Sequence, residues 1–200
     1  MKKTNLFFLL ICLMCVVVAT VLLIVTRAIP VEKQQTSAER RINARTANIV
    51  GKLGKAYAAL EENNPFLAEK ILLQLLKSEP ANPVALRMLG RIYYESGRFE
   101  SAIGIYRKLL ARNEYDASAC NNLGQSLARQ GNFPEALIHL HKALSLNPGS
   151  HSVHFNLAGV YNQLKQPEKA RDHFAAAERL IQQHQGKPAL PQNIQTPGAP

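Results

Sequence analysis

A period of 34 residues constrains the fold of this 200-residue chain more than any other feature. The string Leu-Gly-x-x-Tyr that begins at Leu89 returns as Leu-Gly-x-x-Leu at Leu123, and Ala102 returns as Ala136. A fixed period of roughly 20–50 residues is typical of repeat proteins, in which each unit buries its apolar face against its neighbours. Stacked repeats form scaffolds, so the period favours a binding protein over an enzyme.

Residues that start and end helices recur along the chain. Asn64-Pro65 and Asn82-Pro83 both place an N-cap before a proline at the first helical position. Gly97 and Gly131 fall just past predicted helix ends, where the left-handed conformation favours glycine. Nothing reads as a strand. Residues 37–184 are therefore predicted to form eight helices with turns of two to four residues, which makes four antiparallel hairpins.

The first of these helices is predicted to be longer than one repeat requires. Thr36 and Glu39 have the spacing of a capping box, and apolar residues follow at helical spacing up to about Glu62. A helix of about two dozen residues should therefore start near Ser37.

The recurring residues resemble the tetratricopeptide repeat, which has a large residue, Leu-Gly and Tyr on helix A, and Ala followed four residues later by an aromatic on helix B. In the repeat 83–116 these positions hold Leu86, Leu89, Gly90, Tyr93, Ala102 and Tyr106. The repeats 117–150 and 151–184 carry the same pattern. The resemblance implies an all-α solenoid of four helix-turn-helix repeats, wound as a right-handed superhelix.

The first repeat does not fit the period directly. An unshifted period puts Lys52 and Lys55 at packing positions of helix A, where two ammonium groups would be buried without partners. A shift of two residues makes residues 50–57 match the family pattern instead. We therefore expect this repeat to span 47–82, with two extra residues in its turn near 62–64.

An apolar segment precedes the repeats. Leu6 to Val25 is twenty residues without a charge. A helix of that length spans the hydrocarbon core of about 30 Å, whereas the apolar region of a signal peptide has about 7–15 residues. We predict an uncleaved single-pass anchor. The short Lys2-Lys3 tail and the resemblance to short-tailed signal-anchors favour an extracytoplasmic (periplasmic) soluble domain, while the basic residues after Arg27 favour a cytoplasmic one.

The chain thus divides into four parts. These are a transmembrane signal-anchor (1–27), a linker and N-terminal helix extension (28–46), the tetratricopeptide domain (47–184, repeats 47–82, 83–116, 117–150 and 151–184) and a Pro-rich tail (185–200), which lacks periodicity and is predicted to be disordered.

In this family, helix A lines the concave face, and the resemblance implies a peptide-binding groove there. Carried over by position, the groove residues are Lys52, Lys55, Arg87, Arg91, Tyr94, Asn121, Asn122, Gln125, Arg129, Phe155, Asn156 and Asn162. Amides can hydrogen-bond the backbone of an extended peptide, and guanidinium groups can bind a carboxylate. The expected partner is a protein or peptide, acidic or with a free C-terminal carboxylate. The other interpretation is a solvated scaffold surface, with the partner docked elsewhere.

Other chemistry is not indicated. Cys120 replaces a large packing residue and is expected to be a small buried hydrophobe. His151 and His154 lie one helical turn apart, a spacing that could begin a metal site. However, His154 takes a packing position, His139 and His141 point in different directions, and no Cys or carboxylate joins them, so we expect no metal and no cofactor. The net charge of +10 lacks the interleaved aromatics of a nucleic-acid surface.

We therefore expect a membrane-anchored scaffold for protein–protein interaction rather than an enzyme, serving as an accessory factor for complex assembly. Its layout resembles that of small bacterial single-span tetratricopeptide proteins. The alternative is a structural subunit of a membrane-associated enzyme or secretion complex. Such a subunit would dock through its last repeat, where no capping helix is predicted to cover Phe174, Leu180 and Ile181.

Overall fold

The computed structural model describes residues 36–184, so the predicted anchor and tail lie outside the described residues. Within 36–184 the chain forms helices and no strand. These are α2 (Ser37–Glu61), α3 (Pro65–Ser78), α4 (Pro83–Glu95), α5 (Phe99–Arg112), α6 (Ala117–Arg129), α7 (Phe133–Leu146), α8 (His151–Gln163) and α9 (Pro167–His184). None of the described helices has the length and hydropathy that a membrane span needs.

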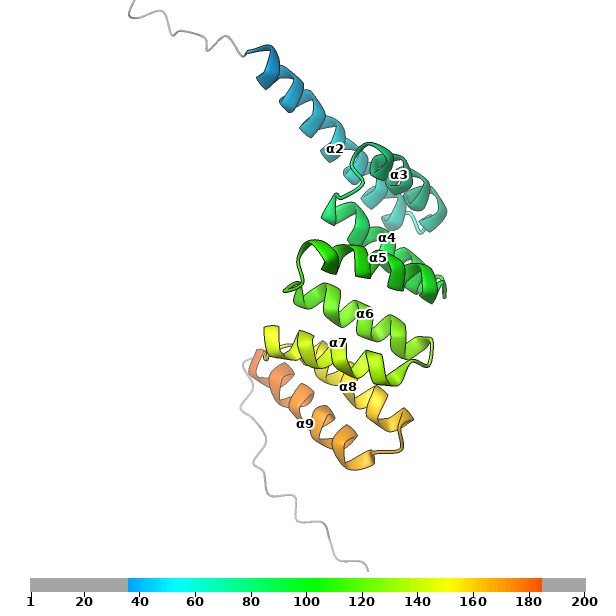
Figure 1. Cartoon of the computed structure of the whole chain (residues 1–200), viewed down its shortest axis with the longest axis vertical. Helices are drawn as coiled ribbons and strands as arrows, with labels where there is room; N and C mark the ends of the chain where they lie inside the picture. The colour runs from blue at the N-terminus through cyan, green and yellow to red at the C-terminus, as the bar shows by residue number, and fades with distance from the viewer. Residues whose placement is uncertain (1–35, 185–200) are drawn as a thin grey trace, which may run out of the picture. The chain divides into compact units, whose positions relative to one another are not determined.

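The helices keep the period of 34 residues throughout. The second helices of the hairpins, α3, α5, α7 and α9, begin at residues 65, 99, 133 and 167. The middle residue of each hairpin turn has a positive φ, and these residues are Asn63, Gly97, Gly131 and Lys165. Helices α3 to α9 pack in chain order, and α6 also contacts α8 directly (Figure 1). The chain separates into two compact units between Ala47 and Asn48, within α2, and this packing lies in the second unit.

Side-chain caps start most of the helices, as the sequence predicts. Thr36 and Glu39 form the reciprocal capping box of α2, with N–H to oxygen distances of 2.7 and 3.2 Å. The side chains of Asn64, Asn82, Asp116 and Asn132 each accept a hydrogen bond from the backbone N–H three residues on. Ser150 takes the N-cap position of α8, but its side chain makes no such bond.

A small residue on each first helix lets the two helices of a hairpin approach closely. A Cβ added to Gly90 would lie 2.8 Å from the Tyr106 ring, and one added to Gly124 would lie 2.7 Å from Cγ of Leu140. Ala56 and Ala158 are the counterparts in the first and last hairpins, and both are completely buried. This close packing at density typical of protein interiors is the reason for the Leu-Gly string.

The two-residue shift predicted for the first repeat is wrong. Val50 and Tyr57, which the shift assigns to the core, are 62% and 53% exposed. The first hairpin turn has the same length as the others, and Ala56 takes the small position that the unshifted period assigns to it. Lys52 and Lys55 do stand at the positions of Leu86 and Leu89. Lys55 is exposed and Lys52 half-buried, so their charges avoid burial.

The last hairpin covers part of its own apolar surface. Helix α9 has 18 residues, against 14 in α5 and α7. Phe174, Leu180 and Ile181 are half-buried on it, and the Phe174 ring packs against Phe155 at 5.9 Å between centroids. These three residues are therefore less open than expected.

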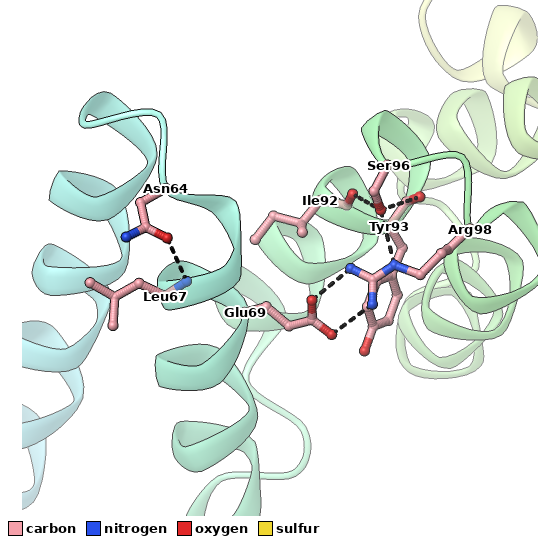
Figure 2. A network of polar contacts seen from close by, with 7 residues as sticks. All are labelled: Asn64, Leu67, Glu69, Ile92, Tyr93, Ser96 and Arg98. Carbon is pink, nitrogen blue, oxygen red and sulfur yellow. Dashed lines mark hydrogen bonds and ion pairs between the residues drawn. The ribbon is translucent and has the colours of Figure 1, made fainter.

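Charged pairs tie neighbouring hairpins together. Arg98 donates to both carboxylate oxygens of Glu69 on α3, at 2.9 and 2.6 Å, while its guanidinium stacks over Tyr93 (Figure 2). Ser96 anchors the other side of Arg98 by accepting from its Nε at 3.0 Å. The Arg98 hydrogen bond lowers the pKa of Glu69, although burial of the carboxyl acts in the opposite direction. The pair Arg107–Glu135 connects the next two hairpins in a similar way.

Candidate functional site

A cavity of about 740 Å³ opens beside the C-terminal halves of α4 and α6 and beside α8 from Phe155 onwards. Its lining combines four aromatic rings with amides, small residues and one charge, from Tyr94, Phe99, Gln125, Ala128, Arg129, Gln130, Gly131, Phe133, Phe155, Asn156, Gly159, Val160 and Gln163. The volume falls within the range of about 300–1,000 Å³ that is usual for ligand sites, and the mixture of apolar walls with a few polar groups is typical of them.

The aromatic wall comes from helix ends and turns. Phe99 and Phe133 are the first residues of α5 and α7, one period apart, and both are half-buried. The Tyr94 ring lies 5.6 Å from the Phe99 ring in a tilted arrangement. Phe155 on α8 is 39% exposed and also lines the cavity. Rings held in this way offer rigid apolar surface at low entropic cost.

Arg129 is the one charged residue in the lining. It lies in the last turn of α6, is exposed, and its guanidinium carbon is 5.6 Å from the centroid of the Phe99 ring. Among the described residues, no carboxylate forms an ion pair with it. Its charge is therefore available at the rim of an apolar cavity.

A network of amides connects α6 with α8. Asn156 donates from Nδ2 to Oδ1 of Asn121 at 2.8 Å and accepts at its own Oδ1 from Nε2 of Gln125 at 3.2 Å. Asn121 also lines a second, polar cavity of about 260 Å³, which lies beside the N-terminal ends of α6 and α8. The amide network therefore lies between the aromatic cavity and the polar one, on the surface of the first helices of two hairpins.

Seven of the twelve groove residues predicted from the sequence line these cavities. Tyr94, Gln125, Arg129, Phe155 and Asn156 line the aromatic cavity, and Asn121 and Asn122 line the polar one. Asn162 is exposed on α8 but outside both cavities. Lys52 and Lys55, at the positions of Leu86 and Leu89, are equally outside them. Whether any of these residues binds a partner remains a prediction.

Arg87 has a structural partner that the sequence did not indicate. Its two terminal nitrogens donate to the two carboxylate oxygens of Asp116 at 3.3 and 3.0 Å, and Asp116 also caps α6. Burial opposes ionisation of Asp116, but the hydrogen bonds from Arg87 and from the Ala119 N–H outweigh it and lower the pKa. Arg91 lies 3.6 Å from Glu95 on the same helix. Both arginines of α4 therefore have an acidic partner within the chain.

The residues that sequence reasoning missed come from the turns and the α8 surface. Phe99, Phe133 and Gln130 flank hairpin turns, whereas the family pattern directs attention to the first helices only. The recurrence of Phe99 as Phe133, each two residues after the turn glycine, was a signal that could have identified the two phenylalanines. Gly159 and Val160 are missed because neither belongs to the positions carried over from the family.

The histidines form a cluster of another kind. The Nδ1 atoms of His154 and His173 lie 2.9 Å apart, His173 stacks on Tyr161 at 5.5 Å, and Nε2 of His141 lies 3.0 Å from the Tyr161 hydroxyl. Burial lowers the pKa of His154 and, together with the two neighbouring histidines, that of His173. In the described part of the chain, no three His, Cys, Asp or Glu side chains could hold a metal ion. Cys120 is fully buried, as predicted.

Comparison with known proteins finds similar chains in several functional settings. The chain is 32% identical over 142 residues to the type IV pilus assembly protein PilF of Pseudomonas aeruginosa. This match covers 70% of this chain and 55% of PilF. It is 29% identical over 132 residues to the DnaJ homolog subfamily C member 7 homolog of Schizosaccharomyces pombe, covering 58% of this chain and 28% of that protein. The match thus spans from about a quarter to just over half of these two relatives.

Solved structures agree with the fold. MamA from Desulfovibrio magneticus RS-1 matches with a TM-score of 0.63 at 18% identity, covering 68% of this chain and 76% of MamA. MamA MSR-1 matches with a TM-score of 0.60 at 24% identity, over 68% and 78% of the two chains. At these identities the likeness shows the fold alone.

Comparison with family models shows which family the chain belongs to. Two models, each described as tetratricopeptide repeat, match residues 53–117 and 115–183. Together they cover the stacked hairpins from α2 to α9. The chain therefore belongs to the tetratricopeptide repeat family, whose helical solenoids mediate protein–protein interactions.

Proposed function

We propose that this chain is a membrane-anchored scaffold that binds an extended segment of a partner protein along α4, α6 and α8, without a catalytic role of its own. The observation that carries the proposal is the amide network of Asn121, Gln125 and Asn156 between two cavities. Side-chain amides both donate and accept, so they can pair with the alternating N–H and C=O groups of a peptide backbone. The cavities on either side would then receive side chains of the same segment.

The geometry supports an extended ligand over a helical one. The polar cavity borders the N-terminal ends of α6 and α8, and the aromatic cavity borders the C-terminal half of α6 and the part of α8 from Phe155 onwards. A peptide crossing from one to the other passes the amides of both helices. Backbone hydrogen bonds would supply affinity that is independent of sequence, and the aromatic cavity would supply selectivity.

The proposal places the scaffold at a bilayer, anchored by residues 6–25 with the repeats on the extracytoplasmic side. It rests on the uncharged run of twenty residues, which lies outside the described structure. Retention of the full-length chain in membranes after carbonate extraction would support the anchor, and release into the supernatant would contradict it. Modification of a cysteine introduced at Gln34 by a membrane-impermeant maleimide in intact cells tests the orientation.

An accessory role in the assembly of a larger complex is part of the same proposal. The similarity to a type IV pilus assembly protein supports it, because the two chains are 32% identical over 142 residues, which is 70% of this chain. The alternative is a structural subunit that docks through α9.

Photo-crosslinking in the cells that make the protein tests the groove. A photoreactive amino acid is placed at Gln163 in the cavity lining, at Lys108 on α5, or at Glu178 on α9, all of them exposed positions. The proposal expects a discrete protein adduct from position 163 and none from 108. Adducts only from 178 would favour the docking subunit, and adducts from 108 alone would overturn the groove.

A further inference from the structure

We infer that the aromatic cavity selects a partner segment in which a bulky apolar side chain lies next to a carboxylate, with Arg129 recognising the carboxylate. The inference rests on the proposed function and adds the chemistry of the ligand to it. Arg129 lies in the last turn of α6, beyond Asn121 and Asn122 on the same helix.

The cavity wall indicates that the partner segment carries a bulky apolar side chain. Packing against neighbouring residues holds the rings of Tyr94, Phe99 and Phe133 in place. Val160, which also lines the cavity, is almost fully buried. Gly159 leaves open space at the wall, since a Cβ built on it meets nothing within 4 Å. The cavity volume of about 740 Å³ exceeds a single side chain, so it holds an apolar group with adjoining backbone.

The charges of the lining residues indicate that the partner segment carries a carboxylate. Arg129 is the only ionised side chain among the lining residues, which include no Asp or Glu. The guanidinium lies over the Phe99 ring. Its N–H groups lie in the guanidinium plane, so a carboxylate at the edge of that plane can accept two hydrogen bonds from them. Charge complementarity therefore favours an acidic group beside the apolar one, and it disfavours a basic neighbour.

Other arginines on this face do not offer the same opportunity. Arg87 is held by both oxygens of Asp116, and Arg91 lies beside Glu95. Arg129 has no acidic partner among the described residues, and it is exposed at a rim that is otherwise apolar or neutral. A partner segment with one acidic residue would thus find a single strong contact rather than a diffuse basic surface.

The test begins with phage display of random linear decapeptides on the full-length chain in lipid nanodiscs. A selected peptide is then synthesised with its acidic residue intact or changed to the amide, and both are titrated by fluorescence anisotropy. Four proteins are compared: wild type, Arg129→Gln, Gly159→Leu, and Gly104→Leu. The last is a matched control, because Gly104 lies on α5 outside the cavity and also has no atom within 4 Å of an added Cβ.

The expected motif pairs Phe, Tyr, Trp, Leu or Met with Asp or Glu. Gly159→Leu should weaken binding about tenfold or more by filling the cavity, while Gly104→Leu should not. The change from acid to amide should weaken binding to wild type about three- to tenfold and have no effect with Arg129→Gln.

The remaining outcomes separate this inference from the proposed function. One such outcome is that Gly159→Leu blocks peptide binding, while the acid-to-amide change weakens binding equally for wild type and Arg129→Gln. That result would overturn the recognition of the carboxylate by Arg129 and would leave the proposed groove unaffected. Peptides unaffected by Gly159→Leu, or no enrichment at all, would overturn both.

Discussion

Gly90 has space for a hydrogen atom on its Cα and for little more. An added Cβ would lie 2.8 Å from the ring of Tyr106, which is only 2% exposed and cannot move into water. We expect Gly90→Ala to destabilise the domain by about 1–3 kcal/mol through overpacking, despite the better helix propensity of alanine. Urea unfolding followed by circular dichroism measures the change.

The matched control for this substitution is Gly104→Ala. Gly104 is exposed on α5, where an added Cβ meets nothing, so alanine there should be neutral or stabilise by up to about 1 kcal/mol. If both substitutions stabilise the domain to the same extent, the close contact between α4 and α5 is not what requires glycine at position 90.

A single carboxyl gives the stability of the domain a predictable pH dependence. The hydrogen bond from Arg98 lowers the pKa of Glu69 below its ordinary value of 4.5, so the folded state holds this proton less tightly than the unfolded state. The stabilisation is present above pH 4.5 and is lost as the pH falls through the folded pKa. Glu69→Gln should therefore cost on the order of 1 kcal/mol at pH 7, with the difference from wild type vanishing in acid.

Urea unfolding of both proteins between pH 7 and pH 3 tests this dependence. Glu178→Gln on α9 serves as the control, because Glu178 is exposed and no described contact involves its carboxylate. A constant difference between wild type and Glu69→Gln across this range would mean that the pair with Arg98 contributes nothing through its charge.

The helices and turns could be predicted from the sequence because the residues that specify them act locally. The caps at Asn64, Asn82, Asp116 and Asn132 and the glycines at 97 and 131 act within one turn of chain. The register of α2 was mispredicted for a different reason. In the described structure no helix precedes α2, so Lys52 and Lys55 can occupy positions that internal helices fill with leucine. A pattern taken from internal repeats does not contain that information.

The contact between α8 and α9 should weaken in mild acid. One Nδ1 of the His154–His173 pair must donate while the other accepts, which requires at least one neutral ring. Burial lowers both pKa values below 6.5, His141 and Arg179 act in the same direction, and Asp172 opposes the shift at His173. The unfolded state thus binds protons first as the pH falls below about 6.5, and stability declines from there.

Thermal unfolding at pH 7.5 and pH 5.5 measures this effect, with His173→Phe as the test. Phenylalanine keeps a ring against Tyr161 but cannot be protonated, so its midpoint should change less between the two pH values than that of wild type. His151→Phe is the control, because His151 is exposed at the start of α8. An unchanged pH dependence in His173→Phe would exclude this pair as its source.

At the scale of the whole molecule, the sequence identified where a groove should lie but not its chemistry. The positions of Gln125, Asn156 and Arg129 follow from the repeat, and they do line the aromatic cavity. The pairing of Arg87 with Asp116 joins residues 29 apart and depends on how one hairpin packs on the next, which no local pattern specifies. For the same reason, the neutralisation of Arg87 could be found only in the structure, whereas Arg91 and Glu95 are four residues apart on one helix.

Each hairpin packs mainly on its neighbours, so the position of a destabilising substitution in the stack should decide which helices lose amide protection. Leu123 on α6 is fully buried between hairpins, so Leu123→Ala should cost about 2–5 kcal/mol and reduce amide protection in α4 to α7 together. Ala177 on α9 is equally buried, yet Ala177→Gly, costing about 1 kcal/mol, should affect α8 and α9 while α4 and α5 keep their protection. Native-state hydrogen exchange read by mass spectrometry distinguishes the two patterns. Equal loss of protection in all helices for both variants would show that the domain unfolds as one unit rather than hairpin by hairpin.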